Sequence, residues 1–85
     1  MNKKQQKFKL GELVYYVALD DNMRWAPYGS TIIAVHYLRG EWNYVVKHHP
    51  VNLGRPAQAL YRDVEQAKRK ALELNKGVKS ESKNV

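Results

Sequence analysis

The stretch that decides the fold is Ser30-Thr31-Ile32-Ile33-Ala34-Val35-His36-Tyr37-Leu38-Arg39-Gly40-Glu41-Trp42-Asn43-Tyr44-Val45-Val46-Lys47. Both of its halves are rich in β-branched and aromatic residues, and a short link containing a glycine separates them. Two such runs predict a β-hairpin with strands at residues 30–39 and 42–47. In the second run Trp42, Tyr44 and Val46 alternate with other residues, so we expect them to share one face of the strand.

A further strand is predicted before the hairpin, at residues 13–19. Both of its alternating sets of side chains are apolar, which predicts that the strand is covered on both faces. The run Asp20-Asp21-Asn22 then supplies residues typical of a turn. Residues 23–29 contain Pro27 and Gly29, and this predicts a loop between the first two strands.

After the hairpin, residues 48–57 hold two prolines and a glycine and are expected to form a loop. A short fourth strand is predicted at residues 58–62. Asp63 is then placed as the N-cap of a helix, with Gln66 completing a capping-box pattern. The helix is expected to run from Val64 to about Asn75 and to end at Gly77. Its expected packing stripe comprises Val64, Ala67, Ala71 and Leu74, with Leu72 on the edge.

This order of elements predicts a mainly β fold, a small antiparallel barrel of four to five strands with one C-terminal helix from about Val64 to Asn75. The residues with the relevant spacing are Phe8-x-x-Gly11-Glu12-x-Val14, Gly29-x-x-Ile32-x-x-Val35, Gly40 before Tyr44-x-Val46, and then Leu60 and Val64. Over residues 8–64 this pattern resembles SH3-like small barrels, including KOW-type and Tudor-type domains. The resemblance implies a binding role, because such barrels bind nucleic acids, peptides, modified side chains or other proteins.

Length and composition indicate one small domain. The chain has 85 residues, 44% of them hydrophobic, and no cysteine, which excludes disulfides and thiolate zinc sites. We expect a basic arm at residues 1–7, one domain at residues 8–77 and a flexible tail at residues 78–85. The N-terminal residues lack the apolar region of a secretory signal, and the longest apolar run has four residues, Ile32–Val35. These features predict a cytoplasmic protein without a membrane partner, either a monomer or a homodimer.

The net charge of +7 is concentrated toward the two ends of the chain. Residues 1–9 contain four lysines and no acid, whereas residues 10–62 contain five bases against four acids. A basic end of this kind is typical either of a segment that contacts polyanions or of a solubilising tail. The candidate electrostatic arm consists of Lys3, Lys4, Lys7 and Lys9.

No motif for catalysis or for cofactor binding is found. The sequence contains neither a Gly-x-Ser-x-Gly elbow nor a phosphate-binding glycine loop. His36, His48 and His49 are its only imidazoles, and their spacing matches no metal motif. We therefore expect a protein that is not an enzyme and that uses neither a metal nor a cofactor.

Aromatic residues next to bases are the most informative feature for function. Trp25 and Tyr28 stand beside Arg24 in the predicted first loop, where packing need not bury them. An aromatic ring at such a place stacks on a nucleic-acid base or on a peptide side chain. The alternative is that Trp25 closes one end of the core as a lid. The candidate binding residues are Arg24, Trp25, Tyr28, Arg39, Trp42, Lys47 and Arg55.

The sequence therefore predicts a small binding module. Its positive charge, basic arm and loop aromatics favour a nucleic-acid-associated accessory protein. The alternative is a protein–protein interaction or inhibitor module, of the kind found among accessory proteins of phages and mobile elements, which would use the same aromatic surface.

Overall fold

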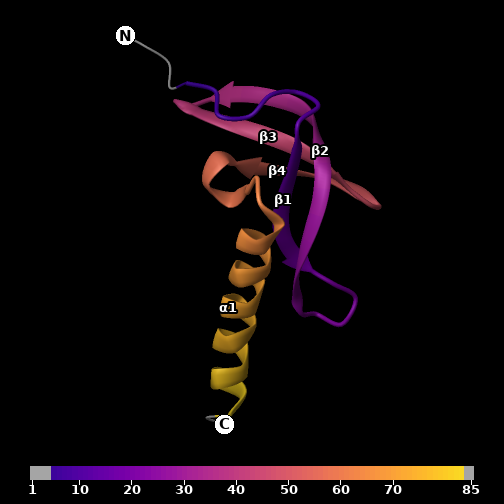
Figure 1. The fold of residues 1–85 in the computed structure, drawn as a ribbon, viewed down its shortest axis with the longest axis vertical. Coiled ribbons are helices and arrows are strands. Elements are labelled where there is room, and N and C mark those ends of the chain that lie inside the picture. Colours follow the sequence, from indigo (N-terminus) through magenta and orange to yellow (C-terminus); the bar gives the residue numbers. More distant parts are fainter. Residues whose placement is uncertain (1–4, 84–85) are drawn as a thin grey trace.

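The computed structural model describes the backbone of residues 5–83 and the side chains of residues 5–76. Within this part of the chain, four antiparallel strands form a sheet in the order β1-β2-β3-β4, and one long helix follows them (Figure 1). The strands are β1 (Leu13–Leu19), β2 (Trp25–Leu38), β3 (Glu41–His48) and β4 (Val51–Pro56). A short 3₁₀ helix, η1 (Ala57–Ala59), leads from β4 toward helix α1 (Val64–Lys83). The predicted mainly β fold with one C-terminal helix is confirmed.

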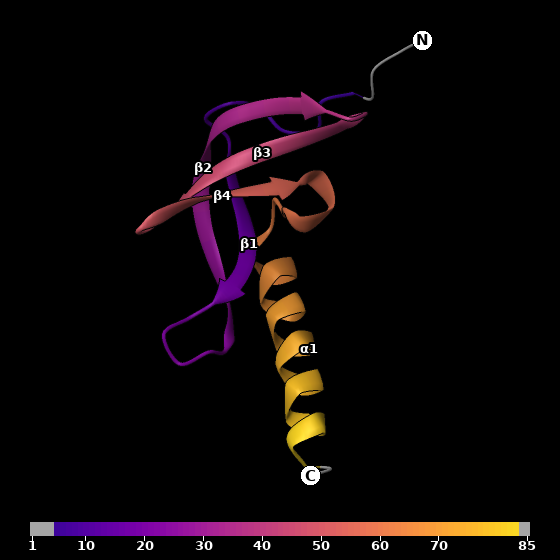
Figure 2. The same ribbon diagram turned by 180° about the vertical axis from the view of Figure 1, so that it is seen from behind.

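The long strand β2 joins the two halves of the sheet. Its first half pairs with β1 and its second half pairs with β3. The register shifts between Ile32 and Ala34, which leaves Ile33 as an extra residue, and a bulge of this kind bends a strand. Figures 1 and 2 show the consequence, since the upper part of β2 curves over to run with β3 and β4 across the end of the β1–β2 hairpin.

The predicted central hairpin is confirmed, with longer strands than expected. Leu38 pairs with Glu41, so the connection has only two residues. Arg39 and Gly40 both have positive φ, 52° and 79°. Two left-handed residues are typical of the type I′ turn, which matches the right-handed twist of the strands.

The core lies on the concave side of the bent sheet. Tyr44 and Val46 are fully buried and Trp42 packs against them, as the alternation in this strand predicts. The buried side chains of this core are Phe8, Val14, Tyr16, Ala18, Ile32, Tyr44, Val46 and Leu60.

The other face of the β1–β2 hairpin is covered by helix α1. Ala67 and Ala71 are buried, the only such residues among residues 64–76 of the helix, and α1 packs against β1 and β2. The predicted stripe is therefore confirmed, with half-buried Val64 and Leu74 at its margins and Leu72 exposed. Tyr15 and Val17 on β1 are half-buried, so the prediction that this strand is covered on both faces holds for its middle.

The start of the helix is confirmed and its predicted end is wrong. The Asp63 carboxylate accepts a hydrogen bond from the Glu65 N–H at 3.0 Å, as an N-cap does. The helix continues through Gly77 to Lys83 instead of ending near Asn75. A single glycine costs a helix only about 1 kcal/mol relative to alanine, so it ends a helix only where the following residues favour another conformation.

The two loop predictions on either side of the hairpin are wrong in part, and the prediction of the fourth strand is wrong. Residues 25–29 belong to β2 rather than to a loop, and residues 51–56 form β4. The predicted fourth strand at residues 58–62 is instead η1 followed by an isolated bridge between Tyr61 and Tyr15. Gly54 and Pro56 are tolerated in β4 because it is an edge strand, where a ladder hydrogen bond is needed on one side only.

The sheet does not close into a barrel. Tyr61 exchanges two backbone hydrogen bonds with Tyr15 at the free edge of β1, at 2.7 and 2.8 Å. Among the described residues, this bridge is the only backbone pairing between β1 and the segment after β4. The predicted fifth strand is absent from the part of the chain described, and no helix in that part is long and apolar enough to cross a membrane.

Candidate functional site

Two hollows lie side by side where η1, the N-terminal segment and α1 meet the sheet. The first, which we name the helix hollow, has a volume of about 380 Å³. It is lined by Val17, Trp25, Arg55, Gln58, Ala59, Tyr61, Lys70 and Leu74. The second, which we name the arm hollow, has a volume of about 400 Å³. It is lined by Lys7, Phe8, Gln58, Leu60, Tyr61, Arg62 and Gln66.

The helix hollow brings together two of the predicted binding residues. Trp25 begins β2 and Arg55 lies near the end of β4, thirty positions later in the chain. Lys70 joins them from α1. The Lys70 ammonium lies 3.2 Å from the Glu73 carboxylate, whereas Arg55 has no acidic partner among the described residues.

Trp25 is held by the helix rather than carried on a loop. Its backbone N–H donates to Asn75 Oδ1 and its carbonyl accepts from Asn75 Nδ2, both at 2.9 Å. The indole is half-buried, so it is neither the freely exposed loop aromatic that we expected nor a fully enclosed lid. The prediction that Trp25 lies on a loop is therefore wrong, because it begins β2. Trp25 nevertheless lines the helix hollow.

Tyr61 forms the boundary between the hollows. Its two backbone bonds to Tyr15 fix its position at the edge of β1, and its side chain is half-buried. Gln58, on η1, is exposed and lines both hollows together with Tyr61. The two hollows therefore adjoin at Gln58 and Tyr61, and we call them together the joint surface.

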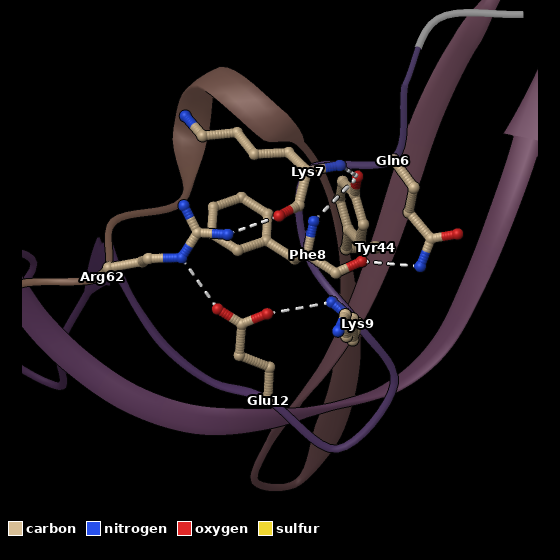
Figure 3. A network of polar contacts seen from close by, with 7 residues as sticks. All are labelled: Gln6, Lys7, Phe8, Lys9, Glu12, Tyr44 and Arg62. Atoms are coloured by element: carbon tan, nitrogen blue, oxygen red, sulfur yellow. Dashed lines mark hydrogen bonds and ion pairs between the residues drawn. The ribbon is translucent and has the colours of Figure 1, made fainter.

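A network of polar contacts builds the arm hollow (Figure 3). The Arg62 guanidinium lies 4.5 Å from the centroid of the Phe8 ring, donates to the Lys7 carbonyl, and meets the Glu12 carboxylate at 2.9 Å. On the other side of this segment, the Tyr44 hydroxyl accepts the N–H groups of Lys7 and Phe8 at 3.0 and 3.4 Å. The N-terminal segment is thereby fastened over the end of the core.

Glu12 is the acid of this network. Its carboxylate accepts the Lys9 N–H at 2.9 Å and the Arg62 Nε–H, and these two bonds lower the pKa of Glu12 below its usual value. Hydrogen bonds to the charged form favour that form. The Glu12 side chain thus neutralises part of the charge of Arg62.

The lining of the joint surface is basic and aromatic. It includes the cations of Lys7, Arg62, Arg55 and Lys70 and the rings of Phe8, Trp25 and Tyr61. Among the described residues, no aspartate or glutamate lines either hollow. Glu12 and Glu73 approach from outside the lining, so Lys7 and Arg55 are its two cations without an acidic partner among the described residues.

Two other predicted aromatic residues belong to the core region instead. Tyr28 stacks on Tyr16 with ring centroids 5.9 Å apart and meets His48 edge-on at 4.7 Å. The Tyr16 hydroxyl lies 2.9 Å from His48 Nδ1, and burial raises the pKa of Tyr16 above its usual value. Trp42 packs edge-on against Tyr37 at 4.8 Å. Neither Tyr28 nor Trp42 lines the joint surface.

The remaining predicted bases are spread over the molecule. Arg24 is exposed in the turn before β2, Arg39 in the β2–β3 turn and Lys47 near the end of β3. Lys9 is exposed beside Glu12, and Lys3 and Lys4 lie outside the described residues. Of the predicted set, the structure assembles Trp25, Arg55 and Lys7 at the joint surface.

Sequence reasoning missed Tyr61, Arg62, Gln58 and Lys70 as site residues. Tyr61 and Arg62 stand within an alternation typical of a strand, and Lys70 belongs to a run of three bases that spreads around a helix. A signal was present in Tyr61-Arg62, which is an aromatic residue beside a base like the Arg24-Trp25 pair that we selected.

The chain was also compared with known proteins. No family model, no curated protein and no solved structure matches it.

Proposed function

We propose that this chain is a small nucleic-acid-binding module that acts by binding rather than by catalysis, and that the joint surface is its contact surface. The observation that supports the proposal is the composition of that surface: four cations and the half-buried aromatic residues Trp25 and Tyr61, with no lining acid among the described residues. The resemblance of residues 8–64 to SH3-like barrels belongs to the same proposal, because such barrels are binding modules.

Each component has a chemical role in this proposal. Lysine and arginine contact phosphate oxygens, and the release of counterions makes such binding weaken as salt rises. Aromatic rings offer faces on which bases stack. Because Arg62 and Lys70 are partly neutralised by Glu12 and Glu73, we expect modest affinity and few phosphate contacts.

The basic arm adds to this surface. Lys7 lines the arm hollow, and its N–H is tied to Tyr44, so the chain before it starts at the rim of the joint surface. Lys3 and Lys4 then add point-charge contacts that position phosphates without reading bases. Removing residues 1–4 deletes two of the arm lysines and leaves the network around Phe8 intact.

The test is a salt titration with fluorescently labelled 20-nucleotide oligomers, followed by anisotropy. With about four phosphate contacts, the log–log slope on a single strand is expected near −3, and removal of residues 1–4 should weaken binding at low salt. Arg55→Ala should reduce affinity several-fold and make the slope shallower by about 0.7.

Arg69→Ala is the matched control for Arg55→Ala. It removes the same charge from an exposed site on α1 that lines neither hollow. The proposal fails if no oligomer binds at 50 mM salt, or if Arg55→Ala and Arg69→Ala behave alike. Binding of a protein partner with little dependence on salt, together with no binding of oligomers, would favour the interaction-module alternative.

A further inference from the structure

The two aromatic residues of the helix hollow are held in place before any ligand arrives. Trp25 is fixed by two hydrogen bonds to Asn75, and Tyr61 by two backbone bonds to Tyr15. Tyrosine and tryptophan have only two side-chain torsions, so rings on anchored backbones lose little conformational entropy on binding. A surface of this kind suits flat ligands that stack.

We propose that the joint surface selects single-stranded nucleic acid, with unstacked bases lying against Trp25 and Tyr61. The backbone of the strand follows the cations Lys7, Arg62, Arg55 and Lys70. This inference rests on the proposed function and goes beyond it, because it names the strandedness of the ligand and the groups that read it.

The shape of the surface favours a single strand. The hollows, of about 400 and 380 Å³, fall within the range of small-ligand pockets, and the half-buried rings of Trp25 and Tyr61 lie in their walls. In a duplex the base faces are stacked on one another and only their edges reach the grooves. Half-buried rings in the walls of such hollows reach a base face only when the base is unpaired.

The helix does not offer the usual means of reading a duplex. A recognition helix places one stripe of polar side chains into the major groove. In α1 the bases Lys68, Arg69 and Lys70 are consecutive, so they point around the helix, and Lys68 and Lys70 are paired with Glu65 and Glu73 at 3.4 and 3.2 Å.

Gln58 adds a polar group at the boundary of the two hollows. It is exposed, and its side-chain amide has both donors and an acceptor. Amides of this kind form hydrogen bonds to the Watson–Crick edge of an unpaired base. We therefore expect Gln58→Ala to change the preference among bases more than the affinity for the backbone.

The experiment compares three probes of equal length: a labelled dT 20-mer, a 20-base-pair duplex and a 20-mer of abasic nucleotides. All are measured by anisotropy with the full chain, and quenching of tryptophan fluorescence is recorded alongside. We expect the dT 20-mer to bind at least tenfold more tightly than the duplex or the abasic strand, and to be the only probe that quenches tryptophan strongly.

Tyr61→Leu removes the ring and keeps both backbone bonds to Tyr15. It should weaken dT binding by about 5- to 160-fold, with little change for the abasic strand. Tyr37→Leu is the matched control, because this tyrosine packs on Trp42 and lines neither hollow. Thermal melts show whether the two variants fold. The comparison of the three probes uses the unmodified chain, so it stands even if a variant fails to fold.

The outcomes distinguish single-strand selection from nucleic-acid binding in general. Equal affinity for the dT, duplex and abasic probes would overturn single-strand selection and leave nucleic-acid binding in place. Failure of all three probes to bind at low salt would overturn both.

Discussion

The pair of hydrogen bonds between Asn75 and Trp25 is the contact on which the helix hollow depends. Asn75→Ala removes both bonds, each 2.9 Å long. A hydrogen bond contributes about 0.5–1.5 kcal/mol net, so the loss is about 1–3 kcal/mol. Alanine also favours the helix over asparagine by up to about 0.7 kcal/mol. The hydrogen-bond loss is the larger effect, and we expect a net destabilisation of about 1–2 kcal/mol.

For a domain of this size, such a loss corresponds to a fall of roughly 5–15 °C in the melting temperature. The assay is thermal unfolding followed by circular dichroism, with tryptophan emission recorded before the transition. Emission should shift to longer wavelength, because the half-buried Trp25 becomes more exposed when the helix no longer holds its strand.

Lys76→Ala is the control for Asn75→Ala. It introduces alanine at the next, exposed position of the helix and should change stability by less than about 0.5 kcal/mol. If Asn75→Ala is as stable as the unmodified chain, with the same tryptophan emission, the helix is not anchored on β2. The helix hollow would then not be preformed.

Two further predictions concern the network that fastens the N-terminal segment. Tyr44→Phe leaves the N–H groups of Lys7 and Phe8 without the hydroxyl that accepts them. The free energy of unfolding, measured by denaturant titration, should fall by about 1–3 kcal/mol. Unchanged stability would show that Tyr44 does not hold the N-terminal segment in place. The pKa of Glu12 is lower in the folded protein than in the unfolded chain, where it is about 4.3. The ionised Glu12 side chain therefore stabilises the fold above about pH 4.3, and this contribution is lost as the pH falls through the folded-state pKa. Stability should therefore decline less steeply below about pH 4.5 in Glu12→Gln than in the unmodified chain. Parallel pH curves would show that the charge of Glu12, with its bonds from the Lys9 N–H and from Arg62, adds no stability.

Local patterns in the sequence were sufficient for β1, the central hairpin and the start of α1. Each depends on interactions between near neighbours: alternation along a strand, a two-residue turn with Gly40, and a cap at Asp63. The burial of Tyr44 and Val46 follows from the same alternation. These features are the ones that the structure confirms.

The candidate site was predicted from residue type and from a place in a predicted loop, and the structure shows most of that loop as part of β2. Trp25 and Arg55 were selected because an aromatic ring and a base are the groups that bind nucleic acid or protein hot spots. Their meeting with Lys70 and Tyr61 depends on how β4, η1 and α1 pack. No spacing in the sequence encodes that meeting, because the four residues come from four separate segments.

The residues that misled the sequence analysis are explained by contacts between distant segments. The backbone N–H and C=O groups of Trp25 point away from β1 and bond to Asn75. Pro27 lies two positions further along β2, so its nitrogen faces the same free edge. Its lack of an N–H group therefore removes no hydrogen bond to β1. A Cβ on Gly29 would lie 2.8 Å from the Tyr15 ring, so this glycine makes room for a cross-strand neighbour rather than marking a turn. Sequence alone determined that residues 13–19 and the two runs of the central hairpin extend and that a helix begins after Asp63, because those preferences are local. Only the tertiary structure decided where proline and glycine continue a strand. Proline is tolerated where its edge of the strand has no pairing partner, and glycine is needed where an aromatic ring packs against the backbone.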